Sequence, residues 1–310
     1  MHPGRAPVSL FRYAPAILVA VTVLIITVVL FAGVRRWETA LAEREFSQEA
    51  SVVVATIRQQ MLQPVDTLKT LNQFFQSVDK VDRDQFHAFA TPMLRNNPSI
   101  RSLSFQRLLT QAELPAYEAR MRKRYPNFSI WHWVDGKRLR MGRLPGYRVI
   151  DYLEPIPGNE AAFGLDVSAD PGQLGAMQRA RDTGLPSASD FVRLLLDQES
   201  QRSFVLLMPV YRFGAVLTDI ESRRRAVIGF TSAIIRTGTL VENSLKESNL
   251  LPGPEISLAL YAGGSPDQRV LAFRIGSDQA PKSENFLWGS WLFNDQLPAF
   301  SQSFNVAGKS

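Results

Sequence analysis

The sequence predicts an α+β protein in which a membrane-spanning helix and a long amphipathic helix precede a domain of antiparallel strands. Three observations carry this prediction: an uncharged apolar run over residues 14–34, an apolar stripe with helical spacing that continues to about Val78, and short strand-like segments after Pro98 that are separated by turns. The chain has 310 residues, of which 45% are hydrophobic, so it is long enough for about two folded domains.

Composition excludes several classes of function. The chain has no cysteine, so it has no disulfide, no thiol chemistry and no cysteine metal site. The formal net charge is +6, but the basic runs Arg120–Arg124 and Arg223–Arg225 have no interleaved aromatic residues, so we expect no nucleic-acid partner. The histidines His2, His87 and His132 lack metal-ligand spacing, and no nucleophile motif occurs. We therefore expect no metal, no cofactor and no enzymatic activity.

The N-terminus carries a predicted membrane anchor. Residues 1–13 are expected to form a short cytoplasmic segment, and residues 14–34 a transmembrane helix, which at about 1.5 Å per residue covers roughly 30 Å. The apolar run is longer than the core of about 7–15 residues in a signal peptide, and Arg35 and Arg36 close it directly, so we expect it to stay uncleaved. Arginines lie on both sides of it, so their distribution does not fix its orientation.

A long stalk helix is predicted over residues 35–80. Its apolar residues recur mostly at intervals of three or four and form one stripe: Leu41, Phe46, Ala50, Val53, Ile57, Met61, Val65, Leu68, Leu71 and Phe75. The stripe needs a partner, which can be the chain's own domain, a second copy, or both. We interpret the helix as a dimerisation and signalling stalk because it continues the anchor; the alternative is a long core helix. Pro64 is expected to kink or divide it.

The first globular module is predicted over residues 81–224. Asp82 is a candidate cap for a helix that reaches about Asn96, and Gln111–Tyr125 is a second, charged helix. Alternation of apolar and polar residues predicts a strand at Ile100–Leu108, and aromatic or apolar runs predict further strands at Phe128–Val134 and Tyr147–Leu153.

The centre of this module is well delimited in the sequence. Asp170-Pro171 is a helix start signal and Gly184 is a stop signal. Two antiparallel strands, Phe191–Leu196 and Phe204–Val210, follow it. The second strand is apolar for most of its length, so we expect it to be central in a sheet and buried on both faces.

Residues 225–310 are expected to form a second, smaller module. Its predicted elements are a strand at Ala226–Ala233, a helix at Thr237–Glu247, and a hairpin whose strands are Ile256–Tyr261 and Arg269–Ile275. The order of strand, helix and hairpin repeats, on a smaller scale, the order in the first module.

Asp166 is the candidate residue for chemistry. It follows the apolar triplet Phe163-Gly164-Leu165, where a carboxylate is costly unless it meets a hydrogen-bond donor. Three interpretations are open: Asp166 caps the coming turn or helix, it accepts a hydrogen bond from a ligand, or it has a catalytic role.

The same region resembles a known family. The residues that carry the resemblance, in this order and spacing, are Glu154-Pro155, Asn159, Gly164-Leu165-Asp166, Ala180-Arg181-Asp182-Thr183-Gly184 and Pro209-Val210-Tyr211. Together, behind an N-terminal anchor, they resemble the CHASE domain, the cyclase/histidine-kinase-associated sensory extracellular domain. The resemblance is good over about residues 47–233 and weak elsewhere.

The resemblance implies a fold and a function. It implies two tandem PAS-like modules outside the cytoplasm, of which the membrane-distal one binds a small-molecule ligand, and an output through a cytoplasmic histidine kinase or cyclase domain. In the plant cytokinin receptors, the aspartate that matches Asp166 contacts the ligand, and the position of Thr183 is tied to binding. The predicted ligand-binding residues are Asp166, Thr183, Ser189, Arg193, Phe204 and Leu206.

Two departures from the family pattern matter. Ser189-Asp190 stands where the family has Ser-Pro, so the ligand class is not carried over. The chain ends at Ser310 before a second membrane span, so we expect it to be a fragment of a larger sensor. We predict a homodimer through the stalk helix in a bacterial inner membrane, with the globular part periplasmic or extracellular. The alternatives are a membrane-tethered hydrolase and a non-sensory envelope interaction protein.

Overall fold

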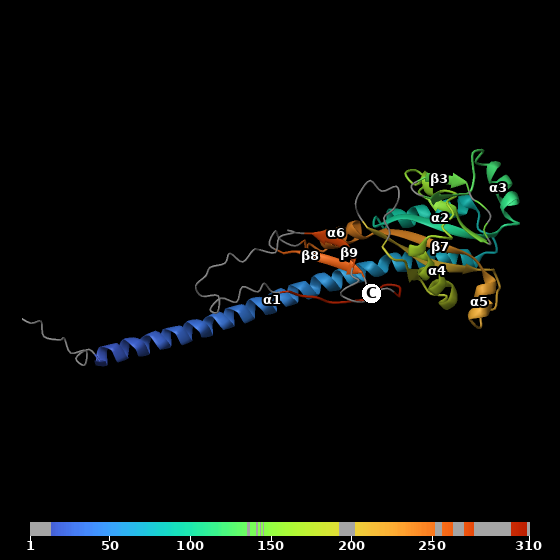
Figure 1. Cartoon of the computed structure of the whole chain (residues 1–310). Coiled ribbons are helices and arrows are strands. Elements are labelled where there is room, and N and C mark those ends of the chain that lie inside the picture. The colour runs from blue at the N-terminus through green and yellow to red at the C-terminus, as the bar shows by residue number, and fades with distance from the viewer. Residues whose placement is uncertain are drawn as a thin grey trace, which may run out of the picture. The chain divides into compact units, whose positions relative to one another are not determined.

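The computed structural model (Figure 1) describes residues 14–134, 137–140, 142, 144, 146–191, 202–251, 256–262, 270–275 and 299–308. The chain divides into two compact units. The smaller unit consists of Met1–Val52 and Gln279–Ser301, and the larger unit of Val53–Asp278 and Gln302–Ser310. Each unit is described by itself below.

Helix α1 (Ala14–Ser77) is one helix. Its first part is apolar and long enough to cross a membrane by length and composition, as predicted for residues 14–34. Pro64 lies inside the helix without dividing it, so the prediction of a division there is wrong. Proline removes one backbone hydrogen bond, but Met61, Val65 and Leu68 around it are buried, and this packing holds the turn in place.

The part of α1 in the larger unit packs on the chain's own domain. The stripe residues from Ile57 to Phe75 are buried in a core with strand residues such as Leu103 and Leu206. Phe75 stacks on Phe105 at 4.7 Å between ring centroids. The sequence left open whether the stripe packs on the chain's own domain, on a second copy or on both. For this segment, packing on the chain's own domain is confirmed.

The centre of the larger unit is a five-stranded antiparallel sheet (Figure 1). Its strands, in spatial order, are β4 (Gly146–Glu154), β1 (Ile100–Thr110), β7 (Val227–Arg236), β6 (Ser203–Tyr211) and β5 (Ser187–Ala188). Numbered among themselves in chain order, these strands have the order 2-1-5-4-3. The predicted α+β class with antiparallel sheets is confirmed.

The position of β7 differs from the expected division of the chain. Its residues were expected to open the second module after residue 224, but β7 lies between β1 and β6 in the sheet of the first. The pairs Phe105↔Thr231 and Leu206↔Ala233 show the register. The sequence of β7 does not indicate which strands it pairs with, because a buried strand has the same apolar pattern in the sheet of either module.

The two faces of the sheet pack against different helices. Along β6, Phe204 and Leu206 belong to the core that contains α1, whereas Val205 and Leu207 pack with Ala180 of helix α4 (Pro171–Thr183). Helix α2 (Arg83–Arg95) begins at the predicted cap Asp82 in a capping box, and α4 begins at Asp170 and ends at Gly184, which has φ 78°. Both helix starts and the stop at Gly184 are thus as predicted.

A buried asparagine joins α1 to the sheet. Asn72 is 0% exposed, and its Nδ2 donates to the carbonyl of Pro209 at 3.0 Å and to Thr231 Oγ1 at 3.0 Å. Its Oδ1 accepts from Gln76 Nε2 at 2.7 Å. Strand β5 pairs with only Leu206 and Leu207 of β6, so Pro209 lies beyond the end of that pairing. Asn72 thus ties α1 to β6 and β7.

The remaining elements surround this sheet. They are α3 (Leu114–Arg122), the hairpin of β2 (Trp131–Val134) and β3 (Lys137–Arg140), the short helix η2 (Glu160–Ala162), α5 (Ile220–Ala226), α6 (Thr237–Glu247), and the hairpin of β8 (Leu258–Ala262) and β9 (Val270–Ile275). The predicted C-terminal helix and hairpin are confirmed. The predicted strand Phe191–Leu196 lies outside the described residues except for Phe191, which is in no strand.

Candidate functional site

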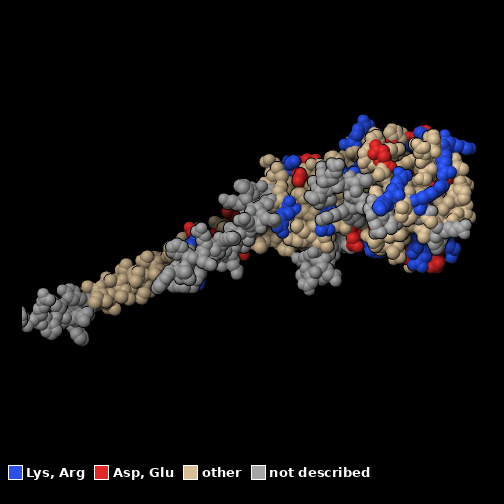
Figure 2. All heavy atoms as spheres, turned by 45° about the horizontal axis from the view of Figure 1, so that its top comes forward, with Lys and Arg blue, Asp and Glu red and all other residues tan. Residues whose placement is uncertain are grey.

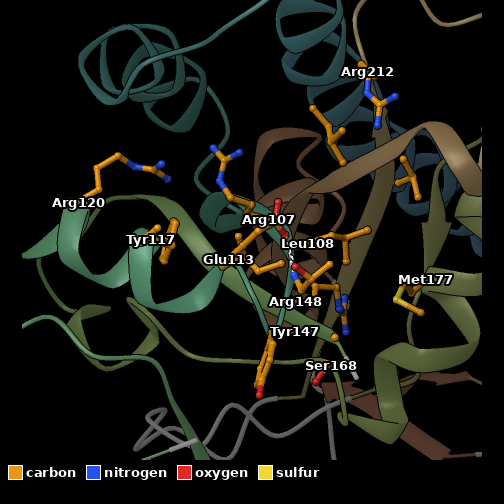
Figure 3. Close-up of a pocket in the computed structure, with 16 residues that line it drawn as sticks. Arg107, Leu108, Glu113, Tyr117, Arg120, Tyr147, Arg148, Ser168, Met177 and Arg212 are labelled. Carbon is orange, nitrogen blue, oxygen red and sulfur yellow. Dashed lines mark hydrogen bonds between the residues drawn. The ribbon is translucent and has the colours of Figure 1, made fainter. Parts of the chain in front are cut away.

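A cleft of about 750 Å³ opens where β1 ends and β4 and β7 begin (Figure 3). It is large enough for a metabolite-sized molecule. Of the 16 residues that line it, four are arginines: Arg107, Arg120, Arg148 and Arg212. We call it the arginine cleft.

The turn from β1 into α3 shapes one side of the cleft. Glu113 Oε2 accepts hydrogen bonds from Thr110 N and Thr110 Oγ1, both at 2.8 Å. These bonds, the backbone one first, hold the pKa of Glu113 below its usual value, so it is ionised at neutral pH. The closed turn brings Tyr117 and Arg120 of α3 to the cleft, and Arg120 lies over the Tyr117 ring at 5.2 Å from its centroid.

Arg148 is the buried charge of the cleft, with 1% of its surface exposed. Its Nη1 donates to Gln106 Oε1 at 2.7 Å and Gln173 Oε1 at 3.3 Å, and its Nη2 donates to the Val167 carbonyl at 2.5 Å. Burial lowers the pKa of Arg148 to about 10, while the charges of Asp170 and Asp166 act in the opposite direction. The guanidinium therefore stays protonated at neutral pH.

A buried polar layer continues from Arg148 across the sheet. Gln106 Nε2 donates to Ser232 Oγ at 3.0 Å, and Ser232 and Ser104 share a hydrogen bond of 2.6 Å. Ser104 and Gln106 are polar positions of the alternation that predicted β1, yet both are buried. Alternation alone does not distinguish a polar face turned to solvent from a polar face covered by other parts of the chain.

Asp166 lies next to the cleft and holds a turn. Its Oδ1 accepts from Arg148 N at 2.8 Å and from Ser168 N at 3.2 Å, and its Oδ2 accepts from Ser168 Oγ at 2.7 Å. Asp166 N in turn donates to the Trp131 carbonyl at 2.8 Å. Three interpretations of Asp166 were left open, and these hydrogen bonds have the geometry of the first, a cap of the turn. Arg148 and Ser168 both line the cleft, so Asp166 positions two lining residues.

Three other predicted ligand-binding residues, Ser189, Phe204 and Leu206, lie apart from the cleft. Ser189 Oγ donates to the Asp190 carbonyl at 2.6 Å and accepts from Val205 N at 2.9 Å, at the edge of β6. Phe204 and Leu206 point to the face of the sheet that packs on α1. Arg193 lies outside the described residues. The structure therefore brings none of Ser189, Phe204 and Leu206 to the arginine cleft.

Thr183 lies at the exposed end of α4. Its Oγ1 donates to the Arg179 carbonyl at 2.7 Å and accepts from Leu185 N at 3.2 Å, so the side chain closes the helix end. Next to it, Asp182 forms ion pairs with Arg181 at 2.9 Å and with Arg224 of α5 at 2.7 Å. The arginine hydrogen bonds, that of Arg224 first, hold the pKa of Asp182 well below its usual value of 3.8.

This lowered pKa predicts a pH-dependent contribution to stability. Because the folded pKa lies below the unfolded one, the contribution is fully present above about pH 3.8 and is lost as the pH falls through the folded value. We expect Asp182→Asn to lower the Tm most at neutral pH, with a difference from the native chain that shrinks below pH 3.8. Thermal unfolding across a pH series tests this, with Asp66→Asn, on an exposed helix face, as control. A Tm difference independent of pH would contradict it.

The arginines of the cleft are not among the binding residues predicted from the sequence. Arg107 and Arg148 lie in the predicted strands Ile100–Leu108 and Tyr147–Leu153. A buried arginine in a strand is a signal that a partner or ligand is present. Arg107 Nε donates to Asp151 Oδ2 at 2.5 Å. Asp151, 2% exposed, also forms an ion pair with Arg83 and accepts from the Tyr117 hydroxyl at 2.8 Å. Burial, followed by the charge of Asp151, raises the pKa of Tyr117, which stays neutral and donates.

The arrangement suits binding better than bond chemistry. Among the described residues, no group of three or more His, Asp or Glu side chains could hold a metal ion. The cleft offers guanidinium groups, the Tyr117 and Tyr147 rings and apolar side chains, including Leu108, which can hold and orient a molecule.

One protein similar to this chain is a signal transduction histidine kinase. Hybrid signal transduction histidine kinase A of Dictyostelium discoideum is 28% identical over 176 residues, which are 53% of this chain and 8% of that protein. The chain thus spans a small part of this relative's length.

Two solved structures are similar at low identity. The ligand-binding domain of the Pseudomonas aeruginosa PAO1 amino acid chemoreceptor PctC, in complex with GABA, has a TM-score of 0.40 and 9% identity over 71% of this chain and 72% of that one. An extracellular ligand binding receptor from Desulfohalobium retbaense DSM5692 has a TM-score of 0.39 and 13% identity over 69% of this chain and 29% of that one.

The family comparison covers the region that carries the resemblance. The family model of the CHASE domain matches residues 79–273, which is more than half of the chain and includes the five-stranded sheet and the arginine cleft. The chain belongs to the CHASE domain family and is an extracellular sensory domain.

Proposed function

We propose that this sensory domain binds a small molecule in the arginine cleft and passes the binding event to α1. One observation carries the proposal: β7 and the chain at the end of β6 take part in both places. The cleft is lined by Arg212, directly after β6, and by Val227 and Ile228 of β7. Asn72 of α1 binds the same two strands through the Pro209 carbonyl and Thr231 Oγ1. A shift of these strands on binding would therefore move the hydrogen bonds that hold α1.

The binding energy limits how far such a signal can go. A ligand shifts an equilibrium between two packings of α1 only by the difference between its affinities for them. A tenfold difference corresponds to about 1.4 kcal/mol, which is the scale of one hydrogen bond such as those of Asn72.

Blocking the cleft tests the proposal. The full chain in lipid nanodiscs is screened by thermal unfolding against a panel of small metabolites. We expect at least one to raise the Tm of the native chain but not that of Met177→Trp, whose larger ring fills the cleft from α4. Leu174→Trp is the matched control, because Leu174 is 41% exposed on the same helix and does not line the cleft. A Tm increase that is equal in Met177→Trp would contradict the proposal.

We further propose an output domain and a membrane anchor for this sensory domain. Because the relative in Dictyostelium discoideum is a hybrid histidine kinase, we propose a cytoplasmic kinase or cyclase output domain. We propose that the domain itself has no enzymatic activity and that α1 anchors it in a bacterial inner membrane with the globular part outside the cytoplasm. The apolar segment of α1 supports the anchor.

We also propose a homodimer through the stalk segment of α1 in the smaller unit. Leu41 is 47% exposed, whereas Ile57 and Leu68, farther along the same stripe, are buried against the chain's own domain. The exposed part of the stripe is therefore free for a second copy. The chain has no cysteine, so single cysteines can be placed in the native background.

Crosslinking in membranes tests the homodimer. We expect Leu41→Cys to form a disulfide-linked dimer under mild oxidation. Glu43→Cys, two residues along and on another side of the helix, is the control and should crosslink much less. The absence of a crosslinked dimer for Leu41→Cys, or equal crosslinking at both positions, would contradict the proposal.

A further inference from the structure

We infer that the arginine cleft takes an organic anion, a small molecule with an apolar body and two or more negative charges on carboxylate or phosphate groups. The inference rests on the proposed function and names the chemical class of its ligand. It follows from the charge balance of the cleft, from the state of Arg148 and from the size and lining of the cavity.

The lining of the cleft has an excess of positive charge. Among the described residues, the lining includes four arginines but only one carboxylate, Glu113, whose Oε2 is already bound to Thr110. Arg107 is paired with Asp151, which Arg83 shares. Arg120 and Arg212 form no ion pair with any carboxylate of the residues that the structure describes. These two guanidinium groups are therefore available to a ligand.

Arg148 supplies the independent observation. It is almost fully buried, and within the described part of the chain all its hydrogen-bond acceptors are neutral oxygens. Its Nε is buried and has no hydrogen-bond partner there. A buried charge without a counter-ion in direct contact is costly. An anion in the cleft would reduce this cost through its charge.

The arginines come from separate elements. Figure 3 shows Arg120 on α3, Arg107 and Arg148 on neighbouring strands, and Arg212 after β6. Figure 2 shows basic side chains close together on the visible face of the domain. Planar guanidinium groups bind carboxylate and phosphate oxygens in pairs, so several of them select for a ligand with more than one negative charge.

The size and the apolar lining exclude a bare inorganic ion as the best ligand. The cavity of about 750 Å³ is far larger than a phosphate ion needs, and Leu108, Leu109, Met177 and Ile228 contribute apolar surface to it. Apolar surface is stabilised by covering it, so the ligand has an apolar or aromatic part beside its charges.

Binding of phenyl phosphate, compared with its neutral analogue benzyl alcohol, tests the inference. Isothermal titration uses the full chain in nanodiscs at constant ionic strength. We expect phenyl phosphate to bind with a Kd at least about tenfold lower than that of benzyl alcohol. The double variant Arg120→Gln/Arg212→Gln should raise the Kd of phenyl phosphate by roughly tenfold or more, because each arginine gives a charge-assisted hydrogen bond. Arg58→Gln, at an exposed position of α1 outside the cleft, should leave it unchanged.

The outcomes separate this inference from the proposed function. Equal Kd values for phenyl phosphate in the native chain and in the double variant overturn the inference, as does tighter binding of benzyl alcohol. If a neutral metabolite stabilises the native chain and loses its effect only in Met177→Trp, the cleft is a binding site but not for anions. If Met177→Trp leaves the binding of phenyl phosphate unchanged, both the inference and the proposed site are wrong. Both replaced arginines lie on the cleft rim, so the variant keeps the buried Arg148 and its fold.

Discussion

Replacing Asp151 with alanine is expected to lower the free energy of unfolding by about 3–5 kcal/mol. The carboxylate is 2% exposed and meets three partners: ion pairs with Arg83 and Arg107, and a hydrogen bond from the Tyr117 hydroxyl at 2.8 Å. Alanine leaves two neighbouring cations without their shared counter-ion and one buried hydroxyl without its acceptor. Removing one partner of a buried pair costs far more than the pair contributes, because the remaining charge stays buried.

Urea unfolding followed by tryptophan fluorescence measures the change. Asp66→Ala is the control, because Asp66 also forms an ion pair, with Lys69, but is 73% exposed; we expect it to change stability by less than about 1 kcal/mol. A loss below about 1 kcal/mol for Asp151→Ala would show that the cluster does not hold α2, β1 and α3 together.

Gly229→Ala is expected to destabilise the chain by about 3 kcal/mol. Gly229 lies in β7, opposite Arg107 of β1 and Val210 of β6. A Cβ at this position would lie 2.5 Å from the Gln106 carbonyl oxygen and 2.7 Å from the Phe105 ring. The nearest atom belongs to the backbone of the neighbouring strand, so the strands themselves must move apart.

Thermal or urea unfolding measures the stability of Gly229→Ala, with Gly175→Ala as the control. A Cβ on Gly175 of α4 would meet only the flexible end of Arg179, at 3.3 Å. There alanine should be neutral or stabilise by about 0.5–1 kcal/mol, because alanine favours the helix over the unfolded chain. Equal stability of both variants would contradict the expectation that β1 and β7 lie too close together at Gly229 for a Cβ.

Local signals in the sequence predicted the ends of elements well, and pairing over long sequence distances poorly. Asp82 and Gly184 mark helix ends because a cap or a left-handed residue needs only its own turn. The place of β7 depends on pairing with β1, across more than half of the domain, so the expected module boundary fell inside one sheet.

The site was predictable only in part for a similar reason. Asp166 was singled out by its place after an apolar triplet, and then by the family resemblance. It lies beside the cleft, where it accepts hydrogen bonds from Arg148 N and Ser168 Oγ. The arginines of the cleft come from α3, β1, β4 and the segment after β6, so no single stretch of sequence contains them. Phe204 and Leu206 show a further limit, because an apolar strand that is buried on both faces does not reveal which face packs on α1.

Pro209 protects the open edge of the sheet against the addition of a foreign strand. On the outer side of β6, the Val205 carbonyl accepts a hydrogen bond from Ser189 N. Pro209 lies four residues further along, so its backbone carbonyl points to the same side. β5 ends before this point. Proline has no N–H to offer to a new strand, and its carbonyl already accepts from Asn72. Pro209 is itself buried, so a foreign strand meets neither an N–H nor a free carbonyl there, and this part of the edge is a poor template for β-aggregation between copies of the domain.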